Sequence, residues 1–216
     1  AINLCAENMA QGCIVARFEG GSEFGPRALG NRSIMADPSF EKMKDVINYR
    51  VKFRESFRPF APVVPVENIE EIFDLKVSSP FMLIVSDIKQ KFQDKLPAIT
   101  HKDGTGRVQT VDKENNTFFH ALTLRLQKFR KGPAVLLNTS YNVAGQPIVE
   151  TPEEAIATFL NTDIDFLCIE NYWVQKKTVA PKDYKAHLEF LPDPIIPIGL
   201  EETDDKHLEL VKLLDD

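Results

Sequence analysis

The segment from residue 116 to residue 142 constrains the fold most, because it holds one complete helix followed by one complete buried strand. Apolar residues at helical spacing form a stripe over residues 116–131, and Gly132-Pro133 ends that pattern. The apolar run 134–137 then has the length of a buried strand, and it leads into five hydrogen-bonding residues, 138–142. A core strand that ends in polar residues is a common ligand-binding position in an α/β sheet.

The same two patterns alternate along the rest of the chain, which predicts an α/β protein with a sheet and flanking helices. Asp37 or Ser39 is expected to cap the second helix, and Thr151 with Pro152 begins the last one. The apolar run 80–88 is expected to be a core strand. Helices are expected over residues 2–11, 40–51, 67–73, 116–131 and from 151. Strands are expected over 13–18, 33–36, 61–66, 80–88, 134–137, 166–169 and 172–174.

Composition excludes several classes of protein. The chain has 216 residues and a formal net charge of −6, which weighs against non-specific nucleic-acid binding. It has no apolar run long enough to span a membrane, and no signal peptide is expected. Cys5, Cys13 and Cys168 lie in apolar surroundings without metal-ligand spacing, so they are expected to be buried free thiols in a cytoplasmic protein. Because the chain begins without Met, a fragment of a longer protein is expected.

Residues 50–58 concentrate four cations and one carboxylate in this acidic chain. Like charges at such spacing repel, and an anion lying among them would relieve that repulsion. Aromatic residues and prolines interleave the cations, so the segment is expected to be anchored in the core. Either this is an anion site, or it is a charged helix end with an arginine held by a surface carboxylate. The residues concerned are Arg50, Lys52, Phe53, Arg54, Glu55, Phe57, Arg58, Pro59 and Phe60.

Residues 19–33 contain four of the ten glycines of the chain, together with Arg27 and Arg32. Glycines at this density allow close backbone approach to a ligand, although the spacing is not that of a P-loop. The stretch is therefore either an anion-facing loop or an ordinary turn with two surface arginines.

A second polar stretch, residues 97–110, includes a turn at Asp103-Gly104. If the chain then enters a strand, Arg107 and Gln109 project to the same side. His101 and Asp103 form only a weak metal pattern, and a structural histidine in a loop is the favoured interpretation; no metal site is predicted. If these clusters converge with Asn138, Ser140 and Asn142, they would bind a polyphosphate. Because no serine or cysteine has the pattern of an activated nucleophile, the expected chemistry is positioning and electrostatic stabilisation of phosphoryl or adenylyl transfer.

Several long motifs resemble the C-terminal domain of the NodU/CmcH-type O-carbamoyltransferases, over roughly residues 12–176. They are residues 23–33, 52–62, 100–109, 137–147 and the Pro-Glu-Glu-Ala run 152–155. That domain is similar to the YrdC-like fold, a twisted mixed α/β sheet, whose Lys-x-Arg and Ser-x-Asn signatures are matched by Lys52, Arg54, Ser140 and Asn142. The resemblance implies a YrdC-like domain over residues 1–176, followed by an extension, 177–216, that packs on it or is partly mobile.

The resemblance also implies a function. In this family the domain binds ATP and carbamoyl phosphate and makes carbamoyl-adenylate, and an N-terminal domain with a bound iron transfers the carbamoyl group to an acceptor hydroxyl. The N-terminal domain is absent from this chain, and Mg²⁺ is expected only as the companion of ATP. Position by position, the resemblance implies that Lys52, Arg54, Arg58, Arg107 and Arg27 hold phosphates or the adenylate. Asn138, Ser140 and Asn142 would hydrogen-bond the phosphate or carbamoyl group, with Lys52, Arg54, Ser140 and Asn142 at the centre of the chemistry.

Three alternatives stay open at this point. A threonylcarbamoyl-adenylate synthase shares the YrdC-like fold, but residues 23–33 and 138–147 favour the carbamoyltransferase. An RNA-binding module of the same fold would show steep salt dependence, and the net charge of −6 makes nucleic acid an unfavoured partner. A ligand-binding scaffold that has lost catalysis would be distinguished only by assay.

Overall fold

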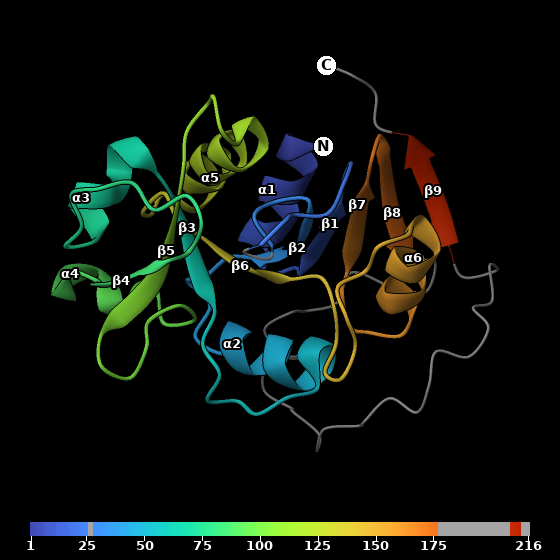
Figure 1. Ribbon diagram of the computed structural model, residues 1–216, viewed down its shortest axis with the longest axis horizontal. Helices are drawn as coiled ribbons and strands as arrows, with labels where there is room; N and C mark the ends of the chain where they lie inside the picture. The colour runs from blue at the N-terminus through green and yellow to red at the C-terminus, as the bar shows by residue number, and fades with distance from the viewer. Residues whose placement is uncertain (26–27, 177–207, 213–216) are drawn as a thin grey trace.

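The computed structural model describes residues 1–25, 28–176 and 208–212, which form a nine-stranded mixed sheet with helices packed against it (Figure 1). The strand order is β4-β5-β3-β6-β2-β1-β7-β8-β9, in which β3/β5 and β1/β7 are parallel and the other neighbours antiparallel. The predicted α/β class is confirmed.

The strands are β1 Val15–Phe18, β2 Arg32–Ala36, β3 Ala61–Pro65, β4 Ile84–Asp87, β5 Thr105–Val111, β6 Leu136–Ser140, β7 Phe166–Ile169, β8 Tyr172–Lys176 and β9 Leu208–Lys212. The helices are α1 Ile2–Ala10, α2 Met43–Val46, η1 Ile47–Lys52, η2 Val66–Asn68, α3 Ile69–Ile72, α4 Gln90–Gln93, α5 Thr117–Arg130 and α6 Pro152–Leu160.

The sheet separates two hydrophobic cores, because side chains alternate between its faces. Val15 of β1 packs in the cluster built from α1 and α5, which includes Met9 and Phe119. Ala16, the next residue along, packs in the other cluster, with side chains from α2, η1 and α6. Burial of a large side chain such as Phe119 stabilises the fold by about 1.5–3 kcal/mol.

The predicted starts of the helices at residues 116 and 151 are confirmed by their caps. The Asn116 side chain accepts a hydrogen bond from the Phe119 amide at 2.9 Å and begins α5. Thr151 and Glu154 form a reciprocal capping box at the start of α6, with Pro152 in the first turn. These capping side chains accept hydrogen bonds from first-turn amides that have no partner within the helix. Because the capping residues are close in sequence to those amides, both helix starts can be recognised from local sequence.

The predicted helix over residues 40–51 is only partly confirmed. An α-helix covers Met43–Val46, and the chain continues as a π-helix, η1, to Lys52. Neither proposed cap acts on it: Lys42 occupies the N-cap position without a side-chain bond, while Asp37 accepts from the Ser39 amide and pairs with Arg130. Asp37 was misassigned because its partner lies on α5, far away in sequence.

The prediction of a core strand over residues 80–88 is wrong in its position. The strand β4 is only Ile84–Asp87, and it forms one edge of the sheet, next to β5. Its neighbourhood exposes large apolar side chains, with Phe81 51%, Leu83 75% and Val85 57% exposed. An apolar run does not reveal whether a strand lies at the centre or at the edge of a sheet.

Other sequence predictions have mixed outcomes. Cys5, Cys13 and Cys168 are buried free thiols, as predicted. Most of the 177–216 extension lies outside the described residues; its described part, β9, pairs antiparallel with β8. None of the helices in the described part of the chain has the length and apolarity needed to span a bilayer.

Candidate functional site

Two adjacent pockets open beside residues 52–60, where the end of β6 meets the start of β3. The first, which we call the arginine pocket, has a volume of about 380 Å³. The second, the lysine pocket, has a volume of about 320 Å³, and Arg54 and Ser140 line both. The arginine pocket is lined by Gly25, Ala28, Arg54, Pro59, Phe60, Ala61, Phe81, Met82, Leu83, Arg107, Asn138, Thr139 and Ser140. The lysine pocket is lined by Lys52, Phe53, Arg54, Glu55, Arg58, Ser140, Asn142, Val143, Ala144 and Gly145.

Lys52 ties the end of η1 to the turn after β6. Its ammonium Nζ donates to the Ser140 carbonyl at 2.7 Å and to the Asn142 carbonyl and Oδ1, each at 2.8 Å. The side chain is buried, and the residue after it, Phe53, takes a left-handed conformation with φ 49°. Ser140 Oγ also donates to Asn142 Oδ1, at 2.6 Å. The predicted Lys52, Ser140 and Asn142 therefore form one hydrogen-bonded cluster.

Arg54 separates the two pockets. Its Nε donates to Asn48 Oδ1 at 2.7 Å, and its guanidinium lies 4.9 Å from the centre of the Phe60 ring. Burial, together with the positive charge of Arg58, lowers the pKa of Arg54 to about 10. The group is still protonated at neutral pH, but its charge is poorly solvated and would be stabilised by an anion.

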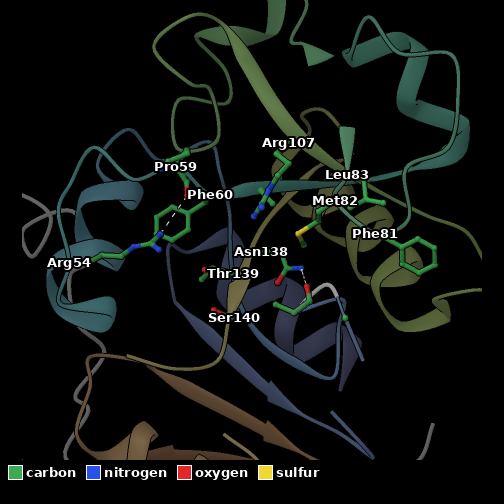
Figure 2. A pocket seen from close by; sticks show the side chains of 13 residues that line it. Arg54, Pro59, Phe60, Phe81, Met82, Leu83, Arg107, Asn138, Thr139 and Ser140 are labelled. Atoms are coloured by element: carbon green, nitrogen blue, oxygen red, sulfur yellow. Dashed lines mark hydrogen bonds between the residues drawn. The ribbon is translucent and has the colours of Figure 1, made fainter. Parts of the chain in front are cut away.

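Arg107 projects from β5 into the arginine pocket, toward the space between Arg54 and Asn138 (Figure 2). Among the described residues it has no hydrogen-bond or ion-pair partner. Gln109 lies two residues further along the same strand and, as expected from alternation, contacts the same region through Asn138.

Asn138 forms the floor of the arginine pocket and is almost fully buried. Its Nδ2 donates to the Ala28 carbonyl at 2.6 Å and to Gln109 Oε1 at 2.9 Å, while its Oδ1 has no donor among the described residues. Both amide hydrogens are therefore used inside the protein. A ligand contact by Asn138 would be made through Oδ1, to an N–H or O–H of the ligand.

Arg58 lines the lysine pocket and is about half exposed, and its Nε lies 2.9 Å from Glu55 Oε2. The segment around it is only partly anchored in the core, contrary to prediction. Phe60 is buried, whereas Phe57 is 76% exposed. The interleaved aromatic residues do not all point inward, because this segment is irregular and has no repeating inward face.

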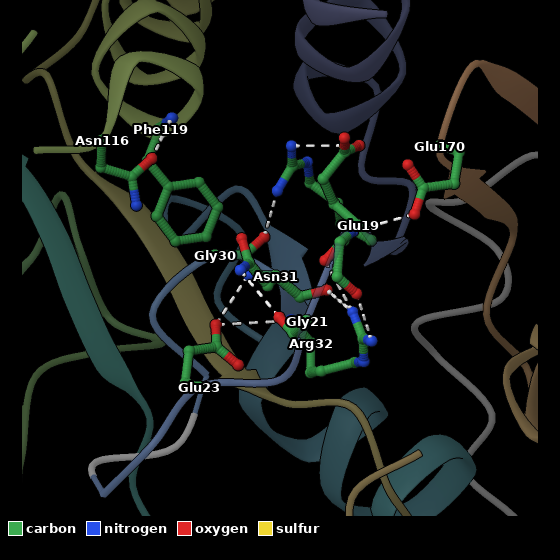
Figure 3. A network of polar contacts seen from close by, with 11 residues as sticks. Glu19, Gly21, Glu23, Gly30, Asn31, Arg32, Asn116, Phe119 and Glu170 are labelled. Atoms are coloured by element: carbon green, nitrogen blue, oxygen red, sulfur yellow. Dashed lines mark hydrogen bonds and ion pairs between the residues drawn. The ribbon is translucent and has the colours of Figure 1, made fainter. Parts of the chain in front are cut away.

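Arg32 does not face an anion. It is 2% exposed, stacks on the Phe18 ring at 3.6 Å, and donates to backbone carbonyls of the glycine-rich loop (Figure 3). Its acceptors are the carbonyls of Glu19, Gly20, Asn31 and Val149. The anion-facing interpretation of Arg32 is therefore wrong, and so is the surface-arginine alternative. Its role is structural, and its partners are backbone atoms that residue patterns do not reveal. Arg27, the other predicted arginine of this loop, lies outside the described residues.

The other residues predicted to bind ligand fall into the two pockets. Arg54, Arg107, Asn138 and Ser140 line the arginine pocket, and Lys52, Arg54, Arg58, Ser140 and Asn142 line the lysine pocket. Sequence reasoning missed the apolar residues that line the arginine pocket, which are Phe60 beside Arg54 and, on the other side, Phe81, Met82 and Leu83. It also missed Asn48, which orients Arg54. Asn48 sits inside a helix pattern, and no local signal separates it from an ordinary helical residue.

His101 is a loop residue, as favoured from sequence. Its Nδ1 lies 3.0 Å from Thr105 Oγ1, and that hydroxyl donates to Asp103 Oδ1 at 2.7 Å. Burial, opposed by Asp103 and reinforced by Arg107 and Lys44, lowers the pKa of His101. No group of three or more His, Cys, Asp or Glu side chains within the described ranges could hold a metal ion.

Comparison with known proteins identifies the family. Residues 6–176 match the family model described as carbamoyltransferase C-terminus. The chain belongs to this family. Its relatives include the nodulation protein NolNO of Sinorhizobium fredii, 44% identical over 87% of this chain and 28% of the relative. The 3'-hydroxymethylcephem-O-carbamoyltransferase of Amycolatopsis lactamdurans is 34% identical over 78% of this chain and 32% of that enzyme.

Members of the carbamoyltransferase C-terminus family can be much longer than this chain, which spans about a third of the length of the curated relatives it matches. Among solved structures, HypF of T. kodakarensis resembles it with a TM-score of 0.51 and 21% identity, over 76% of this chain and 20% of HypF. That likeness agrees with the mixed α/β fold. The YrdC-like assignment within that class stays a prediction.

Proposed function

We propose that this domain binds ATP and carbamoyl phosphate and joins the carbamoyl group to AMP as carbamoyl-adenylate. Membership of the family supports carbamoyl transfer in general. The more specific proposal depends on the two arginines that line the arginine pocket, Arg54 and Arg107. Arg107 has no carboxylate partner among the described residues, and Arg54 donates only to neutral oxygens of Asn48 and Pro59. Two guanidinium groups that line one pocket, neither of them in an ion pair within the described part of the chain, favour a polyanionic ligand.

The chemistry requires little from the protein beyond positioning and charge. One bond forms, between a carbamate oxygen and the α-phosphorus of ATP, and the bond from that phosphorus to pyrophosphate breaks. Carbamoyl phosphate must also lose its phosphate to water, so phosphate and pyrophosphate are both released. Negative charge develops on phosphate oxygens during these steps, where Arg54 and Arg107 would stabilise it. No protein nucleophile is needed, in keeping with the absence of a recognisable one in the sequence.

Two further components belong to the same proposal. Mg²⁺ would arrive bound to the phosphates of ATP, since this ion usually keeps substrate oxygens and water as ligands. Transfer of the carbamoyl group to an acceptor hydroxyl, and the iron associated with it, are assigned to a separate N-terminal domain. The share of the relatives' length that lies outside the matched segment is large enough for such a domain.

Calorimetric titration and an exchange assay test the proposal together. The chain is titrated with ATP and Mg²⁺, with and without carbamoyl phosphate, and incorporation of labelled pyrophosphate into ATP is followed. We expect saturable binding of both ligands and exchange that depends on carbamoyl phosphate. Exchange that instead requires threonine and bicarbonate would redirect the assignment to a threonylcarbamoyl-adenylate synthase. Absence of binding by the folded chain would contradict the proposal.

A further inference from the structure

Two pockets, rather than one, adjoin Arg54. Each has its own second arginine: Arg107 lines only the arginine pocket, and Arg58 lines only the lysine pocket. Arg54 and Ser140 line both, so they form the partition between two separate cationic recesses. A single ligand would not require this duplication, whereas two phosphorylated substrates would, when the carbamate released from one must reach the α-phosphorus of the other.

We propose that the arginine pocket is the nucleotide subsite and the lysine pocket is the subsite for the small carbamoyl donor. This assignment rests on the proposed function and adds to it the place of each substrate. The two substrates then meet at Arg54 and Ser140.

The lining of the arginine pocket fits a nucleotide. Phe81 and Leu83 are 51% and 75% exposed beside Met82, which gives one side of the pocket an apolar wall suited to a planar base. Arg54 and Phe60 lie on the other side of the pocket, Arg107 projects between the two sides (Figure 2), and no carboxylate lines the pocket within the described residues. A ligand with an apolar ring at one end and several negative charges at the other matches this division.

The lysine pocket fits a small ligand that carries both an anionic group and an N–H₂ group. Lys52, Arg54 and Arg58 supply positive charge, and Glu55 supplies a carboxylate that can accept from a carbamoyl N–H₂. The amides of Val143 and Gly145 have no acceptor among the described residues, and Gly145, with φ 77°, borders open space. Amides without internal partners at a turn can bind phosphate oxygens. The wall of large apolar side chains that marks the arginine pocket is not repeated among the residues lining this one.

A pair of arginine substitutions separates the subsites. Arg107→Ala and Arg58→Ala are each titrated with ATP plus Mg²⁺ and, separately, with carbamoyl phosphate. We expect Arg107→Ala to weaken ATP binding by about 10-fold or more and to change carbamoyl phosphate binding by less than about 2-fold. Arg58→Ala should do the reverse, with a smaller loss of about 3-fold, because Arg58 is half exposed and already paired with Glu55.

Two further variants sharpen the test. Glu55→Gln removes the counter-charge of Arg58 and keeps a side-chain acceptor, so it should tighten carbamoyl phosphate binding more than ATP binding, which it affects only through Arg54. Arg125→Ala removes an exposed arginine from α5, which lines neither pocket, and should change neither affinity. Thermal unfolding confirms that each variant is folded.

The outcomes are distinct. Opposite selectivity of the Arg107 and Arg58 variants supports the two subsites. Equal loss of both ligands in both variants, or loss with the ligands exchanged, overturns the assignment while leaving the proposed function standing. A wild-type chain that binds neither ligand overturns both.

Discussion

Lys52 Nζ lies 2.8 Å from Asn142 Oδ1, and this contact joins two segments that are 90 residues apart in sequence. The same ammonium reaches the carbonyls of Ser140 and Asn142, so it holds the backbone after β6 against the end of η1. The lysine is therefore a positioning residue for the pocket as well as a source of charge.

Replacing Lys52 should affect stability and binding together. Lys52→Met keeps the length of the side chain but leaves buried oxygens of Ser140 and Asn142 without their donor. We expect the free energy of unfolding to fall by about 1–3 kcal/mol, measured by urea denaturation. Carbamoyl phosphate affinity, measured by calorimetry on the folded variant, should fall as well. A variant with wild-type stability and wild-type affinity would remove Lys52 from the site.

Arg32 and Arg107 should respond differently to conservative substitution. Arg32→Lys cannot reach the four backbone carbonyls that the guanidinium contacts. We expect a loss of about 1–3 kcal/mol in unfolding free energy and easier proteolysis of the glycine-rich loop. At a temperature where the variant is folded, ATP affinity should stay within about 2-fold of wild type. The matched Arg107→Lys variant should lose ATP affinity without losing stability, and the reverse pattern would contradict the assigned roles.

Removing one partner of the ion pair between Asp37 and Arg130 should be one of the more destabilising single substitutions. Both side chains are nearly buried, and Arg130 also donates to the Pro133 and Val135 carbonyls. Asp37→Asn leaves an uncompensated buried guanidinium, so we expect a loss of about 3–5 kcal/mol, measured by chemical denaturation. Arg125→Ala, on the exposed face of the same helix, is the control and should cost less than about 0.5 kcal/mol.

Stability should fall in mild acid because of His101. Burial lowers the pKa of His101 in the folded chain, reinforced by Arg107 and Lys44 and opposed by Asp103. The folded state therefore binds this proton less readily than the unfolded state does. The resulting stability is present above the unfolded pKa of about 6.5 and is lost as the pH falls through the folded value. His101→Asn should flatten this part of the curve of unfolding free energy against pH, and an unchanged slope would refute the assignment.

Local sequence was sufficient to single out those pocket-lining residues that stand at the ends of regular elements. Lys52 ends a helix pattern, and Asn138, Ser140 and Asn142 end or follow a strand pattern, so all four could be placed from their neighbours. Local sequence could not distinguish Arg32 from Arg107. Both lie within two residues of a glycine and an anion was considered for both, but the partners of Arg32 are carbonyls that include those of Glu19, Gly20 and Val149. That distinction depends on tertiary contacts.

In the fold, too, some elements could be predicted from local sequence and others depend on tertiary contacts. The capped helices α5 and α6 were predictable, because their first turns carry their own hydrogen-bond partners. The position of β4 was not, since the apolar run around it packs one side against the core and leaves Phe81, Leu83 and Val85 exposed. The arginine pocket includes two of these exposed side chains, Phe81 and Leu83, so the error in the fold also hid part of the site.

The π-helix that carries Lys52 has a consequence for how this segment tolerates insertions and deletions. A π-turn is an α-turn with one residue added, and such turns are frequent at functional sites. Deleting one residue within 47–51 would allow a continuous α-helix of better hydrogen-bond geometry. It would also rotate Lys52 by about 100° around the helix axis, away from Ser140 and Asn142. The more regular helix would therefore be unable to assemble the pocket. We expect a one-residue deletion within 47–51 to be tolerated less well than a deletion elsewhere in this helix.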